Sequence, residues 1–134
     1  METVKQIEYN GTLYDIQDAE AQKNLVYSQE ETDTGKIWID GKKIYRKVVD
    51  CGGLLNSVLK KVPHNLQNLK SIVNMSAITI DIANNKFIPL SYANISPYQI
   101  SIAINGDNIE LGTSTDRTNF TQTFVILEYT KTTN

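Results

Sequence analysis

The segment TFVILEYT, residues 123–130, restricts the fold of this chain more than any other, because apolar side chains fall on both of its sides. In an extended strand, one face would carry Phe124 and Ile126, and the other would carry Val125, Leu127 and Tyr129. A strand that is apolar on both faces needs cover on both faces. We therefore expect it in the middle of a β-sandwich, or with its second face covered by a partner subunit.

The chain after residue 53 has the pattern of strands joined by short turns. Residues 99–105 alternate apolar and polar side chains, and the turn NGD then leads into a further strand at 108–112. Other segments with strand character are 54–62, 69–82 and 87–90. Helical periodicity is absent from this part of the sequence. These features predict an all-β fold, an antiparallel β-sandwich of jelly-roll-like type.

The first 34 residues are expected to form a small assembly segment that precedes the sandwich. Residues 4–16 alternate around the dipeptide Asn-Gly, which is a strong signal for a hairpin turn. Asp15 offers an N-cap for a short helix over residues 16–27, and a polar, acidic linker follows. We therefore divide the chain into a hairpin–helix segment, 1–34, and a sandwich domain, 35–134.

The sequence GKIWIDGKKIYRKVVD, residues 35–50, predicts a second hairpin. Asp40-Gly41 fits a two-residue type I′ turn, which would pair Ile37 with Ile44. In that register the isoleucines of the hairpin share one face. We expect this face to lie on the core.

Charge is distributed unevenly along the chain. Residues 1–34 hold eight acids and two bases, a net −6, whereas residues 35–70 hold eight bases and two acids, a net +6. The whole chain carries −2. The basic stretch KKIYRK, 42–47, interleaves cations with an aromatic side chain, as nucleic-acid-binding proteins often do. Because the chain is acidic overall, we expect these cations to pair with the acidic segment and do not expect a nucleic-acid partner.

Catalytic, metal and cofactor sites are not predicted. Cys51 and His64 could form a nucleophile–base pair, but nothing in their spacing enforces it. The acid pairs Glu30/Glu31 and Asp107/Glu110 lie in or beside expected turns, where carboxylates are usually solvated. One cysteine and one histidine cannot make a structural zinc set, and Asp81, Asp107 and Asp116 lack the spacing of an EF-hand loop.

Two loops, 91–98 and 113–120, carry the side chains that a sugar-binding site needs. Aromatic rings stack on the C–H face of a sugar, and amides and carboxylates hydrogen-bond its hydroxyls. Loops held by a rigid sandwich are also where recognition usually occurs. The candidate ligand-binding residues are Tyr92, Asn94, Tyr98, Asp116, Arg117 and Asn119.

Several motifs, in order, give the sequence a family resemblance. They are NGTLYDIQDAEAQ, YSQEETDTGKIWIDGKKIYRKVVD, VPHNLQNLKSI and STDRTNFTQTFVILEYTKTTN, and together they span about residues 9–134. The last three resemble the C-terminal head region of tail-fibre, or receptor-binding, proteins of phages and prophages of Gram-positive bacteria. The first resembles a small segment of phage tail and baseplate proteins.

This resemblance implies a non-enzymatic homotrimer in the virion tail, made in the bacterial cytoplasm and acting at the host cell surface. The implied partners are other tail or baseplate proteins and a cell-wall polysaccharide or teichoic acid. Trimeric heads bury one sheet face around their axis. The expected oligomer-interface residues are Trp38, Tyr45, Val125, Leu127 and Tyr129.

The sequence departs from the family pattern in two ways, and three functions stay open. It has no heptad or collagen-like shaft between residues 27 and 36, and its loop residues match no fixed receptor-binding motif. We expect a protein that attaches to a host glycan. The alternatives are a purely structural tail or baseplate connector and a small polysaccharide-degrading enzyme. Residues 1–25 lack the pattern of a signal peptide, and no apolar run is long enough to span a bilayer.

Overall fold

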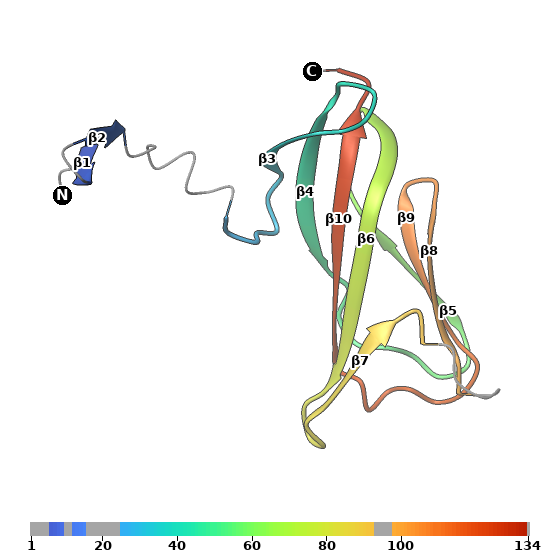
Figure 1. Cartoon of the computed structure of the whole chain (residues 1–134). Helices are drawn as coiled ribbons and strands as arrows, with labels where there is room; N and C mark the ends of the chain where they lie inside the picture. The colour runs from blue at the N-terminus through green and yellow to red at the C-terminus, as the bar shows by residue number, and fades with distance from the viewer. Residues whose placement is uncertain (1–5, 10–11, 16–24, 93–97, 134) are drawn as a thin grey trace.

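The computed structural model describes residues 6–9, 12–15, 25–92 and 98–133, and these residues form three antiparallel sheets (Figure 1). The strands are β1 (Gln6–Tyr9), β2 (Thr12–Asp15), β3 (Thr32–Ile37), β4 (Lys43–Asp50), β5 (Leu59–Pro63), β6 (Leu69–Asp81), β7 (Lys86–Leu90), β8 (Ile100–Asn105), β9 (Asn108–Thr113) and β10 (Gln122–Lys131). The strands β1 and β2 pair with each other as the predicted hairpin.

The largest sheet has the strand order β3-β4-β10-β6-β7, with β10 in the middle. The strand β10 is antiparallel to both of its neighbours, and it joins β4 to β6, which are far apart in sequence. Its buried and half-buried residues alternate from Gln122 to Tyr129. The prediction that 123–130 forms a central strand is therefore confirmed.

The smaller sheet has the order β5-β9-β8 and lies beside the large sheet (Figure 1). The strands β8 and β9 form a tight hairpin in which Asn105 pairs with Asn108. Gly106 occupies the loop with φ +59°, a conformation that glycine adopts without steric cost. This is the turn that the NGD sequence predicts.

The two larger sheets share one core, which makes the fold an all-β sandwich of antiparallel sheets. Its fully buried members include Leu127 and Tyr129 from the large sheet and Ile109 and Leu111 from the small sheet. The predicted helix over 16–27 falls mostly on residues 16–24, which lie outside the described part, and Leu25–Tyr27 are not helical. The described residues contain no helix, and hence none that could span a membrane.

The predicted register of the 35–50 hairpin is wrong. The N–H of Gly41 donates to the Trp38 carbonyl at 2.9 Å, and Gly41 has φ +86°. The loop therefore has three residues and ends on a left-handed glycine, which is a common alternative to the two-residue turn. As a result Ile37 pairs with Lys43 and not with Ile44.

The expectation that the hairpin isoleucines face the core is wrong as well. Ile37 is 59% exposed and Ile39 is 91% exposed. Only Ile44 of this set is buried, and the core side of β4 is formed by Tyr45 and Val49. The apolar pattern of this ribbon thus did not identify its buried face.

The strand expected over 54–62 begins only at Leu59, as β5. The residues before it instead make backbone hydrogen bonds to the loop 113–120. The N–H of Leu54 donates to the Phe120 carbonyl at 2.8 Å, and the N–H of Arg117 donates to the Leu55 carbonyl at 3.2 Å. Asn56 makes an isolated bridge with Asp116. These bonds fix the loop 113–120 to the sandwich.

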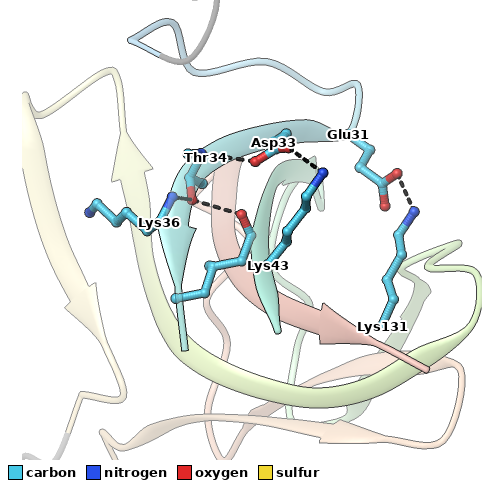
Figure 2. Close-up of polar contacts among 8 residues, drawn as sticks. Glu31, Asp33, Thr34, Lys36, Lys43 and Lys131 are labelled. Carbon is cyan, nitrogen blue, oxygen red and sulfur yellow. Dashed lines mark hydrogen bonds and ion pairs between the residues drawn. The ribbon is translucent and has the colours of Figure 1, made fainter. Parts of the chain in front are cut away.

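Glu31, just before β3, and Asp33, within β3, bond lysines of β10 and β4, and β3 runs across the predicted domain boundary between residues 34 and 35. Lys131 lies 2.5 Å from the Glu31 carboxylate and Lys43 lies 3.7 Å from the Asp33 carboxylate. Figure 2 shows both ion pairs. The Thr34 hydroxyl donates to the Ile44 carbonyl at 2.7 Å. The predicted pairing of the basic ribbon with the acidic segment is therefore confirmed for Lys43.

Candidate functional site

The loop 113–120, one of the two candidate sugar-binding loops, is anchored by a buried carboxylate at the end of β6. Oδ2 of Asp81 accepts from the side-chain amide of Asn119 at 2.9 Å and from that of Asn84 at 2.7 Å. Asp81 is almost completely buried, and the hydrogen bonds from Asn84 and Asn119 lower its pKa. The amide of Asn119 is thus engaged in holding the loop.

Arg117 of the same loop contacts Tyr98. Its guanidinium donates to the Tyr98 carbonyl at 2.5 Å, and the guanidinium carbon lies 5.6 Å from the centre of the Tyr98 ring and 5.8 Å from that of Phe120. Phe120 belongs to the core, whereas the Tyr98 side chain is 52% exposed. Arg117 therefore joins an exposed aromatic ring to the rigid interior.

The other predicted ligand-binding residues have different positions. Tyr92 exchanges two backbone hydrogen bonds with Ile100, of 2.9 and 3.1 Å, and packs against the core. Asp116 accepts from the N–H of Thr118 at 3.0 Å and from its hydroxyl at 2.7 Å, and these two bonds lower the pKa of Asp116. Asn94 lies outside the described residues. Of the predicted set, the structure brings together Tyr98 and Arg117.

A groove of about 400 Å³ lies on the outer face of the small sheet, next in sequence to both Tyr98 and the loop 113–120. Gly112 on β9 forms its floor, paired with Leu59 on one side and Ser101 on the other. A Cβ at Gly112 would lie 2.5 Å from the Ser101 hydroxyl oxygen. Only glycine leaves this floor open without moving Ser101.

The sides of the groove are polar and uncharged. They include Ser57, Gln99, Ser101 and Ser114, and Val58 and Leu59 add apolar surface. Thr113 is also a lining residue, and its hydroxyl donates to the Leu55 carbonyl at 3.0 Å. The groove thus offers hydroxyl and amide groups on a rigid strand floor.

This groove was not predicted from the sequence, although the sequence contains one signal for it. Glycine within a strand often marks a position where another group approaches the backbone closely, and Gly112 interrupts the pattern NIELGT. Ser57, Gln99 and Ser101 carry no comparable signal. Their convergence depends on strand pairing between segments more than 40 positions apart.

His64 has a structural role that is fully accounted for by its hydrogen bonds. Its Nε2 lies 2.9 Å from the Gly106 carbonyl oxygen, and its Nδ1 accepts from the N–H of Leu66 at 3.1 Å. A carbonyl can only accept, so Nε2 carries the proton. The ring pins the β8–β9 turn to the end of β5 and is not paired with Cys51.

Cys51 is buried, and burial raises the pKa of its thiol to about 11. Its Sγ lies 3.9 Å from the Val49 carbonyl oxygen. The Cys51–His64 pair considered from sequence does not form.

In each of the two candidate acid pairs, at least one carboxylate has another partner. Glu31 bonds Lys131, and Glu110 accepts from Asn105 at 3.3 Å.

The predicted oligomer-interface residues fall mainly inside the chain. Val125, Leu127 and Tyr129 have no exposed surface in the single chain, so they cannot contact another copy. Tyr45 stacks with Tyr129, with ring centres 6.1 Å apart. Trp38 is half-buried. The interface assignment of the three β10 residues is therefore wrong, because both sheets of one chain already cover them.

Among the described residues, the opposite face of the large sheet carries apolar side chains that are partly or largely exposed. Phe124 and Ile126 alternate with the buried residues of β10, and Phe124 pairs with Ile78, which is 37% exposed. On the edge strand β7, Phe87 pairs with Ile80 and is 55% exposed. We call these five residues the outer apolar face.

Within the described part of the chain, no group of three or more histidine, cysteine or acidic side chains is placed to hold a metal ion. The comparisons with known proteins return no matching protein family, no matching curated protein and no matching solved structure. Functional inference therefore depends on the geometry described above and on the sequence motifs.

Proposed function

We propose that this protein is a non-enzymatic phage or prophage tail-fibre or baseplate component that attaches to a glycan on the host cell surface. The observation that carries the proposal is the uncharged polar groove around Gly112, adjacent in sequence to the exposed Tyr98 that Arg117 holds in place. Hydroxyls, an amide and an aromatic ring are the groups with which proteins bind sugars. The tail-fibre motifs 27–50 and 114–134 support the same function.

In this proposal the sandwich is the jelly-roll-like head of a homotrimer in the virion tail. The long-range pairing of β10 between β4 and β6 supports that type of sandwich. The outer apolar face supplies surface for contacts between copies, because exposed apolar patches commonly mark interfaces. Residues 1–34, including the β1–β2 hairpin, attach the head to other tail or baseplate proteins.

The test is adhesion of fluorescently labelled protein to isolated cell walls of Gram-positive bacteria. We expect saturable binding to the walls of a host, weakened by Tyr98→Ala. Ile39→Ala is the control, because it removes an exposed apolar side chain that belongs neither to the groove lining nor to the outer apolar face. Failure to adhere to any plausible host wall would overturn the attachment function.

The second candidate is a purely structural connector of the tail or baseplate. The outer apolar face favours it, since such a face needs a protein neighbour and not a glycan. A connector would form stable complexes with neighbouring tail proteins and would show no binding to cell walls. The same adhesion assay therefore separates the two candidates.

A further inference from the structure

We propose that the groove floored by Gly112 binds a single uncharged sugar unit of the host glycan, and not the phosphate groups of a teichoic acid. This inference rests on the proposed function and names the ligand class of its site. It follows from three features of the groove: its size, its lining and the position of the nearest cations.

The size fits a small ligand. The groove is open to solvent and has a volume of about 400 Å³, toward the lower end of the range of about 300–1,000 Å³ that ligand pockets occupy. Gly112 keeps it open, since a Cβ there would lie 2.5 Å from the Ser101 hydroxyl and 3.6 Å from the Leu59 side chain. The pairing of β9 with both β5 and β8 keeps this floor rigid.

The lining provides hydrogen bonds without charge. The Gln99 amide and the Ser101 hydroxyl can both donate and accept, whereas the Ser57 hydroxyl already donates to Oδ1 of Asn56 at 2.8 Å and can only accept. Among the described residues, the side chains of Gln99 and Ser101 have no hydrogen-bond partner, so both are available to a ligand. Leu59 adds an apolar surface suited to the C–H face of a sugar ring.

The groove itself carries no cation, and Arg117 and Lys60 bond backbone carbonyls elsewhere. Phosphate groups are bound by arginine or lysine side chains or by helix N-termini, and none of the eight lining residues is charged. The guanidinium of Arg117 donates to the Tyr98 carbonyl, and Nζ of Lys60 donates to the Gly53 carbonyl at 2.7 Å. Lys61, on the outer face of β5, lies opposite Glu110 in the strand register, so a carboxylate stands beside its positive charge. A neutral sugar therefore matches the groove better than a phosphate does.

The experiment is an NMR titration of the ¹⁵N-labelled full chain with glucose, galactose, rhamnose and N-acetylglucosamine, and separately with glycerol phosphate. We expect at least one neutral sugar to shift the amide signals of Gln99, Ser101 and Gly112. Glycerol phosphate should leave these signals unchanged. Monosaccharide affinities at a single shallow site are expected in the millimolar range.

Variants locate the site. Gly112→Val fills the floor and should weaken sugar binding about tenfold or more. Ala103→Val, which also enlarges a side chain on the same sheet face but outside the groove, should leave binding within about twofold of the original chain. If Gly112→Val does not fold, Gln99→Ala and Ser101→Ala, both at exposed positions, serve instead, each with an expected loss of roughly threefold to tenfold.

Two results would overturn the inference. One is the absence of shifts in the groove with all four sugars, and the other is a shift of the Gln99, Ser101 and Gly112 signals with glycerol phosphate. If the protein still adheres to cell walls in either case, the attachment function stands and only this site assignment fails. Sugar binding in the groove without wall adhesion would instead support the site and contradict attachment.

Discussion

The Tyr129 hydroxyl donates a hydrogen bond of 2.6 Å to the carboxylate of Glu31, which lies 98 positions earlier in the chain. Burial, and then the bond to Glu31, raise the pKa of Tyr129, so the phenol remains the donor. Lys131 bonds the second oxygen of the same carboxylate, and its ammonium lies 4.5 Å from the centre of the Tyr45 ring. This cluster ties the segment before β3 to the central strand.

Replacing Glu31 should therefore destabilise the sandwich. We expect Glu31→Ala to lower the free energy of unfolding by about 2 kcal/mol and Glu31→Gln by about 1 kcal/mol, because glutamine retains an acceptor for Tyr129 but loses the ion pair. Urea titration measures both values. The adjacent Glu30→Gln serves as the control and should change stability by less than about 0.5 kcal/mol. Equal effects at both positions would contradict the role of the cluster.

Asp81 predicts a dependence of stability on pH. Because its pKa is lowered in the folded state, the stability that it contributes is complete above the unfolded-state value of about 4 and is lost as the pH falls through the native value. The stability difference between the original chain and Asp81→Asn should therefore be largest near neutral pH and shrink below about pH 4. Urea titrations across this range measure it.

Cys51 should be unreactive in the folded protein. A buried thiol with a pKa of about 11 exposes little thiolate at pH 8, so a disulfide reagent should label it roughly two orders of magnitude more slowly than a free thiol. Adding Ala83→Cys provides an exposed thiol in the same molecule, which should react at the ordinary rate. Fast labelling of Cys51 in the native state would contradict its burial. In urea both thiols should react alike.

His64 should matter for stability and not for catalysis. His64→Ala removes two hydrogen bonds from a buried site and should lower the free energy of unfolding by about 2–4 kcal/mol. Gln67→Ala, at an exposed position in the same turn, should have little effect. The ¹⁵N chemical shifts of the ring should also show the proton on Nε2. A proton on Nδ1 would contradict the bond from Leu66.

The apolar pattern of the sequence was sufficient to predict which segments form strands, but it did not predict the pairing register of every strand. Strands β6 to β10 fall where the apolar alternation predicted them, since that alternation reports burial on one face. The register predicted for residues 35–50 was wrong because Gly41 can belong to either a two-residue or a three-residue loop. One added loop residue shifts the strand pairing by one position. In β10 the pattern showed two apolar faces but could not show which one the same chain covers.

The residues of the candidate site were harder to predict from the sequence than the strands of the fold. The loops carried Tyr98 and Arg117, and the structure joins them, but Asn119 is used to anchor its own loop to Asp81. A polar loop residue that binds a ligand and one that holds a loop have the same chemistry. The Gly112 groove depends on the pairing of β5, β9 and β8, which local patterns do not specify.

The outer apolar face predicts the assembly state. If it forms the contact between copies in a trimer, light scattering should give a mass three times the 15.1 kDa of one chain. Ile78→Lys places a charge in the centre of that face and should reduce the mass to that of one chain without unfolding it, because Ile78 is partly exposed. Ala103→Lys, on the outer face of the small sheet, should leave the trimer intact. A single-chain mass for the original protein would contradict the trimer, and a trimer that survives Ile78→Lys would place the contact on another surface.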